Sequence, residues 1–256
     1  MDLERERQRR SYRLCLVGFS IYALALVVAS LYSIGSLLLF FNMQRASIGE
    51  LLGIPSLEFQ LDTFRAWSRI ASAVILWSAW SDVSWKRRSG LLVMMATADV
   101  VLWFAQNGVT IGLISEPVHH EIFRQSLSMA LGWAKFVLVA SLASDFTDHV
   151  GIVNAEEFGK AARTTAATGG VIWFIFFLNR IDWSKSWPLV ERQMTRDMFL
   201  LMLGYMVIAA ICLVQTSLLT LLASRSAARA LREMQVQDQA FDPWQASASA
   251  FERDRR

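Results

Sequence analysis

The sequence predicts an all-α, polytopic membrane protein with about six transmembrane helices, and three observations point to this class. Hydrophobic residues make up 54% of the 256-residue chain, and charged residues make up only 18%. An ordinary soluble domain has about a quarter charged residues. The mean hydropathy is +0.37. The apolar residues are gathered in long blocks, which favour helices that cross a membrane and exclude a soluble enzyme or a disordered chain.

Six segments are long enough to cross a hydrocarbon core of roughly 30 Å. The fifth is the weakest, because its strongly apolar run, residues 171–178, is short. We expect residues 1–223 to form one transmembrane helical bundle. Residues 224–256 should form a cytoplasmic helical extension that ends in a disordered tail. The predicted spans are 14–41, 66–85, 91–115, 122–144, 163–180 and 198–223.

The distribution of Lys and Arg predicts the orientation of these spans. Sixteen of the 25 basic residues fall on one side of the predicted membrane and six on the other, with three inside spans. Because basic residues favour the cytoplasmic side, both termini are expected in the cytoplasm. The predicted location is a multi-pass protein of the cell inner membrane or plasma membrane, with the lipid bilayer as its first partner.

The most informative feature is a row of polar residues on the third and fourth spans. Asp99 and Lys135 each lie about nine residues from the inner end of their span, so at 1.5 Å per residue both sit roughly 13–15 Å deep. Antiparallel packing would bring them together. The same spacing repeats outward along each helix. The predicted seam comprises Asp99, Gln106 and Thr110 on the third span, Arg124, Ser128 and Lys135 on the fourth, and Gln215 on the sixth.

Two interpretations of this seam are open. Membrane helices use buried polar groups as structural contacts, at about 0.6–2 kcal/mol each. Ionisable residues inside a membrane also mark paths for protons, ions or small solutes. The first interpretation makes the seam a structural contact within a helical hairpin, and the second makes Asp99 and Lys135 a gate or relay.

Small residues at four-residue spacing predict places where helices approach closely. The pattern occurs on the third, fourth and fifth spans, and it suits either packing within one chain or dimerisation. The glycines concerned are Gly108, Gly112, Gly132 and Gly170.

No catalytic or cofactor-binding motif occurs in the chain. The two clusters with metal-binding residue types, 119–121 and 145–149, fall on opposite sides of the membrane, so no metal site or cofactor is expected. Basic residues are not interleaved with aromatic residues in a soluble segment, so no nucleic-acid partner is expected. We therefore expect a non-catalytic subunit, scaffold or accessory component of a membrane complex, with a homo-oligomer or another membrane protein as partner. The alternative is a small channel or transporter that uses the seam.

Overall fold

The structure is a computed structural model, and it describes residues 2–41, 54, 56–107, 121–152, 155–180 and 196–240. These residues form six α-helices and no strand, which confirms the predicted all-α class for the described part of the chain. In chain order the helices are α1 (Asp2–Phe41), α3 (Leu57–Ala79), α4 (Val83–Asn107), α5 (Glu121–His149), α6 (Ala155–Arg180) and α8 (Arg196–Ala240).

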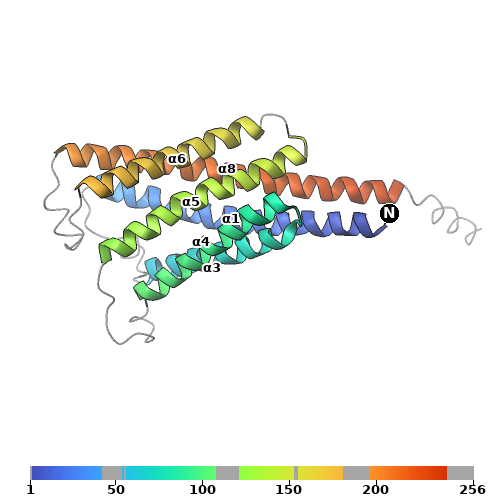
Figure 1. The fold of residues 1–256 in the computed structure, drawn as a ribbon, viewed down its shortest axis with the longest axis horizontal. Coiled ribbons are helices and arrows are strands. Elements are labelled where there is room, and N and C mark those ends of the chain that lie inside the picture. The colour runs from blue at the N-terminus through green and yellow to red at the C-terminus, as the bar shows by residue number, and fades with distance from the viewer. Residues whose placement is uncertain are drawn as a thin grey trace, which may run out of the picture.

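The helices lie lengthwise beside one another in an elongated bundle (Figure 1). Each described helix contacts the next one along the chain, and α8 closes the ring by contacting α1. In addition, α5 contacts α8 across the ring. The order of the ring places α3, α4 and α5 next to one another, and these three helices carry the buried charges described below.

The turn between α3 and α4 is held by side chains of α4 that reach back to the end of α3. The indole N–H of Trp85 donates a hydrogen bond to the Leu76 carbonyl at 2.7 Å, and Lys86 Nζ donates to the Trp77 carbonyl at 2.6 Å. The Asp82 carboxylate accepts the backbone N–H of Trp85 at 3.0 Å. The last carbonyls of α3 and a first N–H of α4 therefore have partners, which is what tight helix ends require.

This turn lies earlier than the sequence predicted. The hydropathy pattern placed a loop between 85 and 91, but α3 ends at Ala79 and α4 begins at Val83. The basic residues at 86–88 are therefore helical. The prediction extended the span to Trp85 and put the loop at the basic residues that follow, whereas the polar turn residues Ser81 and Asp82 come earlier in the chain. Hydrogen bonds from Ser84 and from the backbone of Trp85 hold the pKa of the Asp82 carboxyl below its ordinary value of 3.8.

A glycine ends α5. Gly151 has φ +78°, in the left-handed region that favours glycine. The N–H of Ile152 donates to the Thr147 carbonyl at 3.1 Å, and the N–H of Gly151 donates to the Asp148 carbonyl at 2.9 Å. This is the Schellman arrangement of a helix C-terminus. Residues 145–162, predicted as a loop, are therefore largely helical, because α5 continues to His149 and α6 begins at Ala155.

The first and last described helices are much longer than a membrane crossing needs. Helix α1 has 40 residues and α8 has 45. At 1.5 Å per residue they extend about 60 and 67 Å. The N-terminal part of α1 and the C-terminal part of α8 lie side by side beyond the ends of the other helices (Figure 1). We call residues 2–13 and 224–240 the paired extension.

Ion pairs and small residues join the two halves of the paired extension. Arg5 lies 3.6 Å from Asp238, and Arg9 also pairs with Asp238. Ala227 and Ala230 are buried against α1, and small side chains of this kind let two helices approach closely. Helix α8 continues to Ala240.

Four of the described helices are long and apolar enough to cross a membrane. The qualifying segments are Leu3–Tyr32, Val83–Ala105, Leu127–His149 and Leu203–Asp238. Large apolar side chains on their outward faces are exposed, for example Leu31 at 66% and Val101 at 61%. Exposed apolar surface on this scale suits contact with lipid. Helices α3 and α6 do not reach the same length and hydropathy within the described residues.

Candidate functional site

The centre of the candidate site is an ion pair between α4 and α5. Lys135 Nζ contacts Asp99 Oδ2, and the two side chains are only 2% and 8% exposed. The structure thus brings together the two deepest ionisable residues that the sequence singled out. Both helices are continuous through these positions, so the charges project from regular backbone. Ionisable groups buried this deeply are costly in an apolar bundle unless they are paired.

A third charge, which sequence reasoning did not assign to the seam, joins this pair from α3. Arg69 Nη1 lies 3.4 Å from the same oxygen, Asp99 Oδ2, and its side chain is 13% exposed. The sequence placed Arg69 near the outer end of a span, from where its side chain would extend to the interface. In the structure α3 begins at Leu57, so Arg69 lies in mid-helix and its side chain pairs with Asp99 of the neighbouring helix α4.

Several polar atoms around the pair have no hydrogen-bond partner among the described residues. They are Asp99 Oδ1, Arg69 Nε, Trp103 Nε1 and Gln215 Oε1, and each is buried. A buried polar atom without a partner costs roughly 1–3 kcal/mol. The cluster is therefore polar, enclosed and incompletely satisfied by the protein groups that the structure describes.

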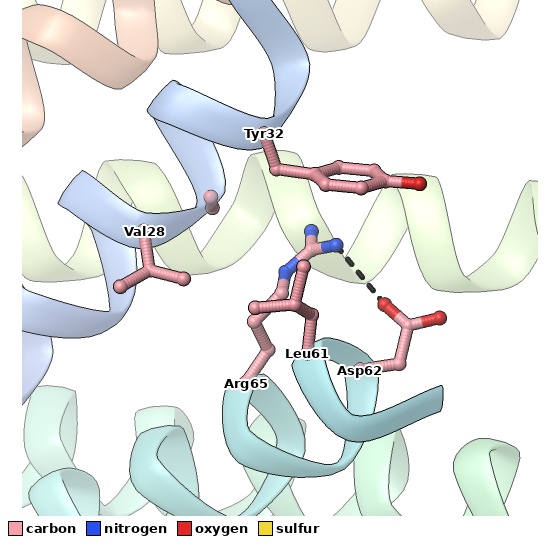
Figure 2. Close-up of a pocket in the computed structure, with 6 residues that line it drawn as sticks. Val28, Tyr32, Leu61, Asp62 and Arg65 are labelled. Carbon is pink, nitrogen blue, oxygen red and sulfur yellow. Dashed lines mark hydrogen bonds and ion pairs between the residues drawn. The ribbon is translucent and has the colours of Figure 1, made fainter. Parts of the chain in front are cut away.

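The polar cluster continues outward along α3. Arg65 lies one helical turn before Arg69, and its Nη1 donates a hydrogen bond to Asp62 Oδ1 at 3.2 Å. Figure 2 shows the Arg65 guanidinium between the Tyr32 ring of α1 and the Asp62 carboxylate. These side chains line a small pocket between α1 and α3, whose remaining wall is apolar. The signal in the sequence was the spacing of Asp62, Arg65 and Arg69, which places all three on one helical face.

Most of the outer seam that the sequence predicted on α4 and α5 lies outside the described side chains. Gln106 and Arg124 lie in described helices, but their side chains are outside the described part, as is the whole of Thr110. Ser128 is exposed. Gln215 is half-buried on α8, and its Oε1 is among the unpartnered atoms named above. Among described side chains, the charged residues that lead outward from Asp99 lie on α3.

The predicted packing glycines behave differently from one another. A Cβ added at Gly170 would lie 3.3 Å from Trp133 Cβ, so this residue does allow close packing of α6 on α5. A Cβ added at Gly132 would meet no atom within 4 Å, so Gly132 makes no close helix contact within the described chain. Gly108 and Gly112 lie outside the described residues.

The closest contacts involve glycines that the sequence did not single out. A Cβ at Gly169 would collide with the Trp133 ring, and one at Gly159 would collide with Ser144. A Cβ at Gly18 would lie 2.8 Å from Leu76 Cγ, where α1 meets α3. The spacing of these glycines along the chain does not distinguish them from the others. Whether a Cβ fits at a glycine depends on which side chain of the neighbouring helix lies against it.

Among the described residues, no group of three or more His, Cys, Asp or Glu side chains is arranged to hold a metal ion. Cys15 and Cys212 are buried free thiols. At the opposite end of the bundle from the pocket, Arg88 of α4 pairs with Asp145 of α5. This pair is about one-third exposed on both sides, so it joins two helices at the surface.

Comparison with models of protein families, with curated proteins and with solved structures gives no match for this chain. Function must therefore be argued from the geometry above. The arrangement contains two cations on one buried carboxylate oxygen, a third cation one turn outward, and a pocket beside it. This arrangement places charged side chains between helices in the interior of the bundle.

Proposed function

We propose that this protein is a non-catalytic component of a membrane complex, with six transmembrane helices and both termini in the cytoplasm of a cell inner or plasma membrane. The count of six adds α3 and α6 to the four long apolar helices, because all six described helices lie lengthwise in one bundle. The orientation follows from the basic residues near the α3–α4 turn and in the paired extension.

The observation that carries this proposal is the paired extension. A hydrocarbon core is about 30 Å thick, so roughly half of α1 and of α8 is not needed for crossing. The extra turns are nevertheless packed together as a helix pair with its own ion pairs. Leu3 and Val236, which lie within it, are 72% and 64% exposed. A rigid helix pair that presents apolar side chains among charges is suited to binding another protein.

The experiment is purification of the full chain from its own membranes in a mild detergent, followed by mass and stoichiometry measurement. The test variant carries Leu3→Glu with Val236→Glu. The matched control is Val83→Glu, which changes another exposed apolar residue at the start of α4. A stoichiometric protein partner that is lost in the test variant and kept in the control supports the proposal. A homogeneous species with no partner contradicts it.

A second function, transport of a proton, ion or small solute, is favoured by one separate observation. The described cluster of Arg69, Asp99 and Lys135 contains two cations and one carboxylate, so it carries an excess positive charge inside the bundle. Intramembrane charges of this kind often lie on ion or proton paths. A buried charge that the described side chains do not balance could interact with a moving ion.

Flux measurements in liposomes test this second function. Lys135→Gln is the informative variant, because it retains the Arg69–Asp99 pair and should fold. Flux in the wild type that is lost in Lys135→Gln, and kept in the surface variant Asp145→Asn, supports transport. A doubly substituted protein, Asp99→Asn with Lys135→Gln, that folds and keeps full cellular function would show that the cluster is only a structural contact.

A further inference from the structure

The pocket beside the charge cluster has a definite composition. It lies between α1 and α3, encloses about 80 Å³, and is lined by Val28, Ala29, Tyr32, Leu61, Asp62 and Arg65 (Figure 2). A space of this size can hold several water molecules or a molecule of a few heavy atoms. One side of the pocket carries a guanidinium and the other is hydrocarbon.

Arg65 retains unused hydrogen-bonding capacity at this pocket. A guanidinium has five N–H donors, and the ion pair with Asp62 engages Nη1. Arg65 Nε, which is itself buried, has no hydrogen-bond partner among the described residues. The side chain is 33% exposed, so part of it is accessible from the pocket. The site therefore contains a cation that could accept a second negatively charged partner.

A second cation lies near the pocket. Arg65 and Arg69 are four residues apart on one helical face, so both contribute positive potential there, and Arg69 pairs with Asp99 further in.

The shape and charge of the pocket select among anions. The Asp62 carboxylate at the rim already pairs with Arg65 and disfavours a multiply charged phosphate, so a monoanion is favoured. The planar fork of arginine matches a carboxylate. Val28, Ala29 and Leu61 provide an apolar wall for hydrocarbon. We propose that this pocket binds a monocarboxylate, with the carboxylate on Arg65 and a short hydrocarbon segment against the apolar wall. The proposal holds whichever of the two functions above is correct.

The test is a saturation-transfer NMR titration of the full chain in phosphatidylcholine nanodiscs at constant ionic strength. Butyrate is the probe and butyramide is its neutral counterpart. Butyrate should bind saturably and butyramide should not. Arg65→Gln should weaken butyrate binding at least tenfold, because a charge-assisted hydrogen bond is lost. Arg65→Lys keeps the charge but loses the planar guanidinium. Its affinity for butyrate should therefore lie between those of the wild type and Arg65→Gln.

The matched control is Arg88→Gln. Arg88 is also paired with an aspartate and is 32% exposed, against 33% for Arg65, but it lies away from the pocket. Its butyrate affinity should equal that of the wild type. If Arg65→Gln does not fold, Leu61→Trp fills the pocket without changing any charge and should abolish binding.

A parallel titration with decanoate separates two sources of the carboxylate. Binding of butyrate indicates a water-soluble ligand, and binding of decanoate alone indicates a fatty acid that enters from the bilayer. Either result supports the proposal if the binding is lost in Arg65→Gln and kept in Arg88→Gln. The proposal is overturned if neither carboxylate binds saturably, if butyramide binds as well as butyrate, or if Leu61→Trp leaves binding unchanged.

Discussion

The shared carboxylate of Asp99 makes a sharp prediction about stability. Asp99 faces two cations, so replacing it and replacing one of its partners should have very different effects. Asp99→Asn leaves Arg69 and Lys135 buried with no carboxylate between them. Lys135→Gln instead leaves Arg69 and Asp99 as a one-to-one pair, and the new amide can still donate a hydrogen bond to the carboxylate.

The structure sets the size of the two effects. At the Arg69–Asp99 separation of 3.4 Å, Coulomb's law with an effective dielectric constant of about 20 gives an attraction of about 5 kcal/mol before the desolvation cost. Removing one partner of a buried pair costs about 3–5 kcal/mol. We therefore expect Asp99→Asn to lower the free energy of unfolding by about 3–5 kcal/mol. Lys135→Gln should lower it by about 1 kcal/mol, because the remaining ions are balanced.

Unfolding by SDS in mixed micelles, followed by tryptophan fluorescence, measures both values. Asp145→Asn is the control, since it breaks an ion pair that is about one-third exposed and should change stability by about 1 kcal/mol or less. The reasoning is refuted if Lys135→Gln costs as much as Asp99→Asn, because the two cations would then not share the carboxylate. It is equally refuted if Asp99→Asn is neutral.

Three further predictions concern packing, a buried hydrogen bond and pH. Gly169→Ala should destabilise the protein by about 1–3 kcal/mol because the new methyl group collides with a buried indole ring. Gly132→Ala, with open space around it, should be neutral or slightly stabilising in the same SDS titration, and equal losses would contradict this. Ser72→Ala should cost about 1 kcal/mol by removing the hydrogen bond to the backbone of α1. Ser141→Ala, which removes a bond within its own helix, should cost less in thermal unfolding. Asp82→Ala should lower the melting temperature at neutral pH. Because the folded state depresses the pKa of the Asp82 carboxyl, this difference should persist above pH 3.8 and shrink as pH falls through the depressed pKa. A difference that does not change with pH would refute the capping role.

Hydropathy and helical periodicity anticipated much of the fold, but they misplaced the α3–α4 turn. The all-α class followed from the long apolar blocks. The turn was predicted at the basic residues 86–88, but it falls at residues 80–82, where side chains of the next helix supply partners for the end of α3. The length of α1 was underestimated for a different reason. Its first residues are charged, and they form a helix because α8 packs beside them.

The candidate site was anticipated only in part. Depth along the helix put Asp99 and Lys135 at one level, and the structure places them in contact. The same estimate of depth did not assign Arg69 to the seam. The second span was predicted to begin at residue 66, which put Arg69 near its end, whereas α3 begins at Leu57. The pocket at Arg65 could not be predicted, since it needs the position of α1 relative to α3.

The sequence by itself determined the all-α class, the existence of long apolar helices and the matching positions of Asp99 and Lys135 along their helices, because these depend on local composition and on a fixed rise per residue. Tertiary structure decided which charges meet, which glycine is sterically required and where α1 and α8 leave the bundle as a pair. Those outcomes depend on how each helix is rotated about its axis and on which helix lies next to it. That two described cations share one carboxylate emerges only when Arg69 of α3 is seen beside Asp99 and Lys135.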